Sequence, residues 1–155
     1  MIREASLSDF GAISALEGQV FYIHFNARAD MLKPKKEPFN RDYFEKCLND
    51  ENIKIFVFEE SGSILGHCIA RKCEIKNHEL FRDMTMLEID VLCVDERARG
   101  KSIGRQLFNT VKAYAKEIGV ARLELMVWEF NKCARQFYEQ LGMSARISRM
   151  ELIIE

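Results

Sequence analysis

The stretch that most constrains the fold is residues 87–105, where an apolar segment is followed by a basic turn that contains glycine. Residues 87–94 are rich in aliphatic and β-branched side chains and contain no Gly or Pro, which predicts a buried strand. Behind the turn, apolar residues recur at helical spacing over residues 103–118, and Gly119 predicts the end of that helix. The chain order is therefore strand, turn and helix N-terminus.

The turn has the features of an anion-binding site. A helix N-terminus offers unpaired backbone N–H groups and the positive end of the helix dipole. Gly100 and Gly104 remove side chains that would keep an anion away from these groups. Four cationic residues surround the glycines: Arg97, Arg99, Lys101 and Arg105. These features predict a phosphate or pyrophosphate ligand, while a solvated, charged helix start is the alternative for this stretch alone.

The turn lacks the two common nucleotide-binding motifs, G-x-G-x-x-G and G-x-x-x-x-G-K-[ST]. Residues 97–102 read Arg-Ala-Arg-Gly-Lys-Ser. This run resembles the acyl-CoA-binding motif of the GNAT superfamily of N-acetyltransferases, Arg/Gln-x-x-Gly-x-Gly/Ala. Ser102 stands where the family usually has Gly or Ala. Because Ser is small and can cap a helix, we expect the turn to survive this change.

A second motif follows about thirty residues later, where residues 131–143 read Asn-Lys-Cys-Ala-Arg-Gln-Phe-Tyr-Glu-Gln-Leu-Gly-Met. It is similar to the family signature Asn-x-x-Ala-x-x-Phe-Tyr-x-x-Leu-Gly-Phe, and Met143 alone departs from it. Asn131 is a natural N-cap, and the apolar positions share one helical face, so an ordinary amphipathic helix is the alternative. Two motifs in the right order and spacing favour the family, and the resemblance covers roughly residues 85–154.

The predicted element order, β-α-α-β-β-β-α-β-α-β, indicates one α/β (α+β) domain over residues 1–155 and is also the order of the family. The resemblance implies a mixed, mostly antiparallel sheet with helices on both faces. It also implies two central parallel strands that splay apart to admit the pantetheine arm of CoA. The strands are expected at residues 1–4, 53–58, 64–73, 87–94, 121–127 and 147–154. The first helix is expected to begin at residues 8–9 and the second at residues 40–42. The third is expected to end at residue 118, and the fourth to span residues 131–141.

The resemblance also implies which residues bind acetyl-CoA and which one donates a proton. The N–H of Val94 corresponds to the donor that stabilises the tetrahedral oxyanion. Tyr138 corresponds to the general acid that protonates the leaving thiolate, while a core tyrosine is the alternative. The expected cofactor-binding residues are Leu92, Cys93, Val94, Arg97, Arg99, Gly100, Lys101, Ser102, Ile103, Gly104, Arg105, Asn131 and Arg135.

Two carboxylates on the central strand are candidates for the general base. Glu88 and Asp90 lie on one side because side chains alternate along a strand, and Leu92 is expected to continue that side. Glu88 ranks slightly above Asp90. The family's other option is a glutamate at the position of Met126, so that route is absent. The alternative is that both carboxylates are solvated or paired with nearby cations. Against it, carboxylates on a central strand are costly to bury without a role or a partner.

The acceptor side is less defined by sequence. Residues 20–25 are unusually aromatic and are expected mainly in the core, although the segment between the first two helices walls the acceptor site in the family. His24 and Asp30 are therefore candidate substrate contacts. Cys93 is expected to be a buried, inert thiol. No metal site is expected, because strand neighbours such as His67 and Cys68 point to opposite faces.

Composition restricts the partners. The formal net charge of −1 argues against a nucleic-acid binder held by bulk electrostatics. No apolar run approaches the length of a membrane span, and the N-terminus carries no signal-peptide core. The five cysteines do not show the spacing of a disulfide framework, so we expect reduced thiols in a cytoplasmic protein. A homodimer is possible, since dimers are common in the family, but no sequence stripe indicates an interface.

These observations predict a small acetyl-CoA-dependent N-acetyltransferase that moves an acetyl group to a primary amine by direct attack in a ternary complex. A small-molecule amine is slightly favoured as acceptor. A protein N-terminus or lysine is the first alternative, and a non-catalytic CoA-binding sensor module is an alternative of another class. The presence of Tyr138, Asn131 and the strand carboxylates favours the enzyme.

Overall fold

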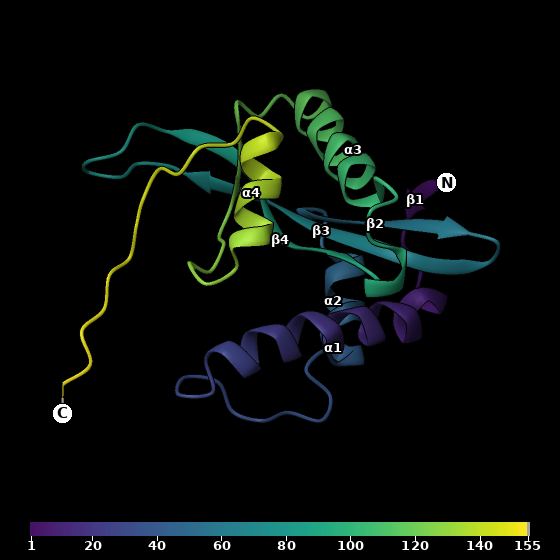
Figure 1. Ribbon diagram of the computed structural model, residues 1–155. Coiled ribbons are helices and arrows are strands. Elements are labelled where there is room, and N and C mark those ends of the chain that lie inside the picture. Colours follow the sequence, from purple (N-terminus) through teal and green to yellow (C-terminus); the bar gives the residue numbers. More distant parts are fainter. Residues whose placement is uncertain (155) are drawn as a thin grey trace.

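A five-stranded sheet in the order β1-β2-β3-β4-β5 forms the centre of the protein, whose computed structural model describes residues 1–154 (Figure 1). The strands are β1 (Ile2–Glu4), β2 (Ile53–Glu60), β3 (Ser63–Ile75), β4 (Met84–Val94) and β5 (Arg122–Leu125). The helices are α1 (Phe10–Ala27), α2 (Arg41–Asn49), α3 (Ile103–Glu117) and α4 (Lys132–Gln140), with short 3-10 turns at Leu7–Asp9 and Glu96–Ala98.

The sheet is mixed, as predicted. The pairs β1–β2, β2–β3 and β3–β4 are antiparallel, whereas β4 and β5 are parallel and are connected through α3. Helices α1 and α2 cover one face, and α3 and α4 cover the other (Figure 1). The parallel pair places the basic turn at the end of β4, where a ligand can reach both the strand and the start of α3.

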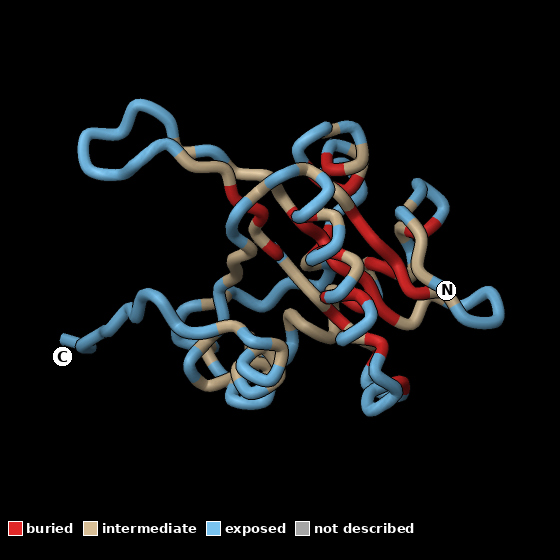
Figure 2. Tube along the Cα trace, turned by 90° about the horizontal axis from the view of Figure 1, so that it is seen from above, coloured by how far each residue is buried: buried red, intermediate tan, exposed pale blue. Residues whose placement is uncertain are grey.

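Each face of the sheet has its own apolar core. Alternate residues of β2 divide between them: Phe56 faces α3, and Val57 faces α1 and α2. The α3 stripe predicted from sequence is buried, with Leu107 and Val111 fully excluded from solvent. Figure 2 shows the buried stretches running along the central strands and under the helices. The fold therefore rests on the central strands, which carry the candidate site at one end.

Strand β4 contains a bulge that sequence periodicity did not predict. Ile69 of β3 pairs with Val91, but the next residue, Ala70, pairs with Ile89. Asp90 is therefore an extra residue with no partner of its own on β3. A bulge of this kind bends the strand and increases its local twist.

The bulge reverses the side-chain alternation of β4. Leu87 belongs to the core on the α3 face, but beyond the bulge it is Leu92 that packs there, and Val91 packs against the opposite core. The expectation that Leu92 continues the side of Glu88 and Asp90 is wrong, because period-two alternation holds only along an unbroken strand.

The predicted last strand is also wrong. Residues 147–154 form no strand in the structure, and the chain runs outward beyond α4 (Figure 1). A β-strand needs a neighbouring strand for its backbone hydrogen bonds, and this segment reaches none within the described chain. Its large apolar side chains are therefore exposed: Ile147 by 80%, Met150 by 93%, Leu152 by 83%, Ile153 by 74% and Ile154 by 82%.

The aromatic residues 20–25 are not core residues, contrary to expectation. Helix α1 continues through them to Ala27, and none of the six is buried. Tyr22 is 53% exposed and Ile23 is 41% exposed, because the helical rotation turns them away from the sheet. The other aromatic side chains of this run remain partly covered, and among them His24 packs against Trp128 and Phe130 in the segment after β5.

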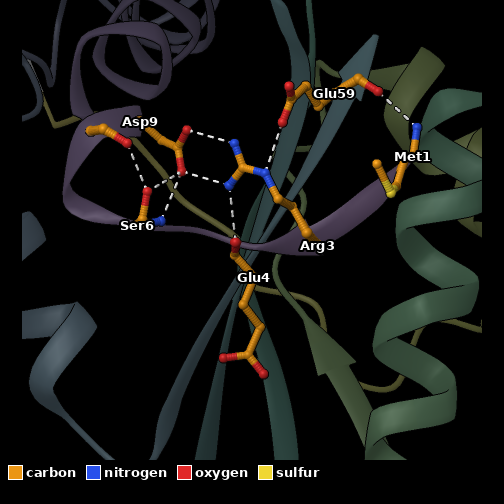
Figure 3. Close-up of polar contacts among 7 residues, drawn as sticks. Met1, Arg3, Glu4, Ser6, Asp9 and Glu59 are labelled. Carbon is orange, nitrogen blue, oxygen red and sulfur yellow. Dashed lines mark hydrogen bonds and ion pairs between the residues drawn. The ribbon is translucent and has the colours of Figure 1, made fainter. Parts of the chain in front are cut away.

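The N-terminal strand is held by a polar network around Arg3 (Figure 3). The Arg3 guanidinium donates hydrogen bonds to both carboxylate oxygens of Asp9, at 2.8 and 2.9 Å, and to Glu59 at 2.8 Å. Asp9 is only 6% exposed. These hydrogen bonds, and those from Ser6, lower the pKa of Asp9 from its usual 3.8 to about 2.

Replacing Arg3 should remove a pH-dependent part of the stability. Because the folded-state pKa of Asp9 is depressed, the carboxylate stabilises the fold above about pH 4 and loses that contribution as the pH falls toward 2. Arg3→Met should lower the unfolding free energy by about 2 kcal/mol at pH 7 and by much less near pH 2. Urea denaturation at both pH values measures this. Lys54→Met, which breaks an exposed pair with Glu4, is the control and should change stability little.

Candidate active site

The central feature of the site is an interruption in the pairing of β4 with β5. The two strands pair only from Met86–Arg122 to Ile89–Leu125. Residues 90–94 of β4 therefore have no partner on the β5 side among the residues described. The bulge at Asp90 turns β4 away, and β5 ends after four residues. The predicted splay of the two parallel strands is confirmed.

The register shows which backbone groups face this gap. The N–H of Asp95 donates to the carbonyl of Leu65 on β3 at 2.9 Å. In an antiparallel pair, the direction of the backbone groups alternates from residue to residue. Leu92 and Val94 therefore direct their N–H and C=O groups away from β3, and the carbonyl of Val94 accepts a hydrogen bond from Nε of Arg99 at 3.4 Å. Cys93, which was predicted with them, directs its own backbone groups toward β3.

The turn after β4 leaves several helix N–H groups free. Gly100 has φ of +81°, and Ser102 has φ of +61° at the N-cap of α3. Ser102 makes no capping bond with its side chain, contrary to the capping role considered for it. The carbonyl of Ser102 accepts from Gln106 N–H at 3.0 Å, and the N–H groups of residues 103–105 precede that first helical bond. These N–H groups are available to an anion, and pyrophosphate binding at this turn stays a prediction.

Gly104 also has a packing role that the sequence did not predict. A Cβ atom at this position would lie 3.2 Å from Cζ of Phe137 and 3.6 Å from Cγ2 of Val94. Its missing side chain therefore lets α4 pack closely against the first turn of α3. Since Phe137 is adjacent to Tyr138, this contact helps to fix the helix that carries the predicted acid.

The predicted cations differ in how far their charges are already neutralised. Arg97 pairs with Asp95 at 3.0 Å, and Arg135 pairs with two glutamates at 3.0 and 3.1 Å. Within residues 1–154, no ion pair involves Lys101 or Arg105. These two side chains therefore keep their full positive charge beside the N-terminus of α3, where a phosphate would benefit from it.

Tyr138 lies on α4 with its ring against Phe108 and Phe137, at centroid distances of 6.3 and 5.2 Å. Burial raises the pKa of its phenol, and the nearby thiols of Cys68 and Cys93 raise it further. The hydroxyl therefore keeps its proton at neutral pH. A phenol O–H that stays protonated can donate a hydrogen bond or a proton to an anion that forms beside it.

Cys93 is a buried thiol, as expected. It is 3% exposed, and its Sγ donates to the carbonyl of Leu16 at 3.4 Å. Burial, with a smaller contribution from Glu17, raises the pKa of Cys93 to about 12. The thiolate is the reactive form, so this cysteine is inert at neutral pH.

Asn131 forms the predicted N-cap of α4. Its side-chain oxygen accepts a hydrogen bond from the N–H of Ala134 at 3.2 Å. The oxygen is thus used within the helix start, and the side-chain NH₂ group is the part of Asn131 that can reach a ligand.

The two candidate bases lie in different surroundings. Asp90 sits at the bulge and accepts hydrogen bonds from Nε and Nη2 of Arg71, at 3.2 and 3.1 Å. Glu88 is half-buried, lies 3.8 Å from Sγ of Cys73, and is opposite Glu124 in the register of β5. Asp90 is therefore already paired with a cation, whereas Glu88 has another carboxylate as its neighbour.

Sequence reasoning missed a buried pair under β4. Glu17 of α1 contacts Nε2 of His67 at 2.9 Å, and His67 is fully buried. The Nδ1 atom of His67 has no hydrogen-bond partner among the described residues. A signal was present, because Glu17 stands four residues after Ile13 on the apolar stripe of α1, where a charged residue is unexpected.

The acceptor-side candidates are only partly brought together. The His24 ring packs against Trp128 and Phe130, with centroids 6.2 and 5.9 Å away, and burial lowers its pKa. Asp30 is exposed and forms an ion pair with Arg28 at 2.8 Å. Arg28, which the sequence did not single out, lies over the Trp128 ring at 5.7 Å. His24 therefore belongs to an aromatic cluster with Trp128 and Phe130. Asp30 is linked to this cluster through its ion pair with Arg28, which lies over the Trp128 ring.

Other kinds of site receive no support from the described residues. Within residues 1–154, no three His, Cys, Asp or Glu side chains gather in a way that could hold a metal ion. In the same part of the chain, no helix has the length and apolar character needed to cross a membrane. All five cysteines are free.

Sequence comparison identifies relatives along most of the chain. The model of the acetyltransferase (GNAT) family matches residues 21–143. An uncharacterized N-acetyltransferase of Methanocaldococcus jannaschii is 34% identical over 113 residues, covering 72% of this chain and 48% of that protein, so the match spans about half of the relative's length. YhfO, an uncharacterized N-acetyltransferase of Bacillus subtilis, is 32% identical over 144 residues, covering 91% of this chain and 87% of that protein.

Solved structures share the whole fold. A mutant of the BH1408 protein from Bacillus halodurans matches with a TM-score of 0.97 and 30% identity, covering 100% of this chain and 99% of that one. The aminoglycoside N-acetyltransferase AAC(6')-Iy in complex with CoA matches with a TM-score of 0.75, covering 100% and 99%. At 12% identity, that second likeness shows the fold alone.

Proposed function

Because the chain belongs to the GNAT family of acetyltransferases and is an acetyl-CoA-dependent N-acetyltransferase, we propose that it acetylates a small primary amine by direct attack within a ternary complex. The observation that carries this proposal is the gap opposite residues 90–94 of β4. The backbone groups of Leu92 and the N–H of Val94 face this gap, and Tyr138 packs against the same core as these two residues.

The cofactor would be held by complementary backbone groups. The pantetheine arm carries amides, which pair with free backbone N–H and C=O groups such as those of Leu92. The pyrophosphate would accept hydrogen bonds from the N–H groups at residues 103–105, with Lys101 and Arg105 adding positive charge. The complex of AAC(6')-Iy with CoA supports CoA as the ligand of this fold.

The acyl transfer then needs a donor for the oxyanion, an acid for the leaving thiolate and a base for the amine. The amine nitrogen attacks the thioester carbon, a C–N bond forms, and the negative charge collects on the carbonyl oxygen. The N–H of Val94, which faces the gap, would donate to that oxygen. When the C–S bond breaks, the thiolate takes the proton of the Tyr138 hydroxyl, which is protonated at neutral pH because burial raises its pKa.

The amine must lose a proton before or during attack. We propose that a strand carboxylate accepts it through a water molecule. Glu88 keeps its rank above Asp90, because Asp90 already accepts two hydrogen bonds from Arg71. Asp90 remains the nearer of the two to the gap, since pairing with β5 ends at Ile89.

The pH–rate profiles of Glu88→Gln and Asp90→Asn should identify the base. The variant that lacks the base should lose the acidic limb of its kcat/KM profile and roughly 10²-fold or more of its rate at neutral pH. Glu74→Gln, an exposed carboxylate on β3, is the matched control and should keep the wild-type profile. If both strand variants also keep it, the amine arrives already deprotonated.

The acceptor should be a small cationic amine. Glu88 lies near the end of the β4–β5 pairing and has no ion-pair partner among residues 1–154, whereas Asp90 and Glu124 are paired with Arg71 and Arg146. A carboxylate without a cationic partner attracts an ammonium group. Two fold neighbours are aminoglycoside acetyltransferases, at 12% and 16% identity. An aminoglycoside therefore belongs in the panel of acceptors, although likeness at that level concerns the fold only.

Release of free CoA thiol, measured with a panel of amines, tests the proposed function. The panel contains a polyamine, amino acids, an aminoglycoside, a peptide with a free N-terminus and a lysine peptide. We expect turnover with small amines, lowered by roughly 10²–10⁴-fold in Tyr138→Phe. Turnover with the peptides alone would establish a protein acceptor. Tight acetyl-CoA binding with no turnover on any amine would establish a sensor module.

A further inference from the structure

A buried polar pair joins helix α1 to the strand beside β4. Nε2 of His67 on β3 lies 2.9 Å from a carboxylate oxygen of Glu17 on α1. The His67 side chain is fully buried, and that of Glu17 is 16% exposed. Because an ionised carboxylate has only acceptor atoms, the Nε2–H of His67 is the donor. Polar groups are costly to bury, so a pair at this depth calls for a reason other than stability.

Two further contacts fix the same turn of α1 to the end of β4. Cys93, the register partner of His67, donates from Sγ to the carbonyl of Leu16 at 3.4 Å. The backbone N–H of Glu96, in the turn after β4, donates to the side-chain oxygen of Gln19 at 3.1 Å. One turn of α1 therefore makes polar contacts with β3, with β4 and with the segment that follows β4.

Val94 lies among these anchored residues and carries the N–H proposed to stabilise the oxyanion. It pairs with Gly66 of β3, but its stretch of β4 has no partner on the β5 side among residues 1–154. Strand pairing therefore holds this end of β4 from one side only. A misplacement of about 1 Å in a group that acts in the transition state can cost roughly 10²-fold in rate. The contacts with α1 supply a restraint that a second neighbouring strand gives elsewhere in the sheet.

Helix α1 also contacts the other side of the gap. The His24 ring packs against Trp128 and Phe130, which follow β5. Arg28, at the end of α1, lies over the Trp128 ring at 5.7 Å. Figure 1 shows α1 running along the sheet on the face opposite α3 and α4. Helix α1 therefore connects the end of β4 with the chain that follows β5, across the interval where the two strands do not pair.

The turn proposed to bind pyrophosphate is held from the opposite face of the sheet. Ile103 and Leu107 of α3 pack on β3 at Gly66, where a Cβ atom would lie 3.3 and 3.2 Å from their side chains. The same Cβ atom would lie 2.8 Å from the carbonyl oxygen of Cys93, so glycine is needed for this close approach. Helix α1 has no part in this packing. Loss of the α1 contacts should therefore disturb the end of β4 more than the first turn of α3.

We propose that Glu17 and His67 are positioning residues, which hold the end of β4 so that the N–H of Val94 meets the oxyanion. The inference rests on the proposed acetyl transfer, because it concerns the step in which the oxyanion forms. The pair acts through α1 and β4 and does not contact the reacting atoms. Its loss should lower the rate of the chemical step and leave acetyl-CoA binding nearly unchanged.

Two variants of the pair separate positioning from stability. Glu17→Gln keeps an oxygen that can accept the Nε2–H of His67, so its kcat should stay close to the wild-type value. Glu17→Met/His67→Leu replaces both partners by apolar side chains of similar volume, which leaves no unpaired polar group. This double variant should unfold near the wild-type temperature, while its single-turnover rate should fall by roughly 10²-fold. Isothermal titration should give an acetyl-CoA affinity close to that of the wild type.

Arg3→Met is the matched control, because it removes a buried polar contact with Asp9 at the other edge of the sheet. It should lose stability and keep kcat. Glu17→Met alone should show the same loss of rate as the double variant, and it carries the test if the double variant does not fold.

Three outcomes would contradict the inference. A wild-type rate in the folded apolar variants would make the pair purely structural, while acetyl transfer itself would stand. Equal losses of rate in Glu17→Gln and Glu17→Met would show that the hydrogen bond is not what matters. A wild-type protein that acetylates no amine would overturn the proposed function and this inference together.

Discussion

Tyr138→Phe should lower kcat by roughly 10²–10⁴-fold while leaving acetyl-CoA affinity nearly unchanged. The substitution keeps the ring that packs against Phe108 and Phe137 and removes only the hydroxyl. Partial burial raises the pKa of that hydroxyl and keeps it protonated, so its loss removes the donor that would protonate the leaving thiolate. Single-turnover rates, with calorimetry for the affinity, separate the chemical step from binding.

The control for this variant is Tyr114→Phe. Tyr114 lies on α3 and packs against Phe56 in the same core, so it tests the removal of a tyrosine hydroxyl away from the gap. We expect its kcat to stay within a factor of about two of the wild type, as for a hydroxyl with no part in the chemistry. An unchanged chemical rate in Tyr138→Phe would assign that residue to the core instead.

Gly100→Val should weaken acetyl-CoA binding by roughly 10-fold or more. Gly100 has φ of +81°, a conformation that a β-branched residue strongly disfavours. The valine side chain would also stand where an anion approaches the N–H groups of residues 103–105. Isothermal titration with acetyl-CoA measures the affinity of the variant and of the wild type.

Gly62→Val is a closely matched control. Gly62 has φ of +75°, and a Cβ atom there, as at Gly100, would meet nothing within 4 Å. It lies in the β2–β3 turn, outside the candidate site, so it carries the same backbone strain without the ligand. Both variants should lose similar stability, but only Gly100→Val should lose affinity. Equal acetyl-CoA affinities in the two variants would show that the turn does not bind the cofactor.

The features that sequence predicted are those that depend on neighbouring residues. Asn131 caps α4 because its side chain reaches an N–H three residues away. The apolar stripe of α3 is buried, as its helical spacing predicted. The φ of Gly100 is positive at the turn where a glycine was expected to be needed. Each of these rests on local geometry and periodicity, which a single stretch of chain carries by itself.

The features that sequence could not predict depend on residues far apart in the chain. Gly104 is needed because Phe137 packs against it, and Glu17 meets His67 across fifty positions. The bulge at Asp90 is defined only by the register with β3. In each case, the deciding partner is selected by the folded arrangement of the elements, and only Glu17 leaves a local signal, as a charged residue on the apolar stripe of α1.

The sequence by itself determined the order of the elements, the glycine turn and the two motifs, because these follow from spacing and backbone preference. Only the tertiary structure decided which side of β4 Leu92 occupies, which backbone groups face the gap, and that residues 147–154 stay unpaired. The physical reason is that strand pairing is a contact between distant segments. A strand-forming sequence favours the extended conformation, but the strand forms only where a neighbouring edge can pair with its backbone.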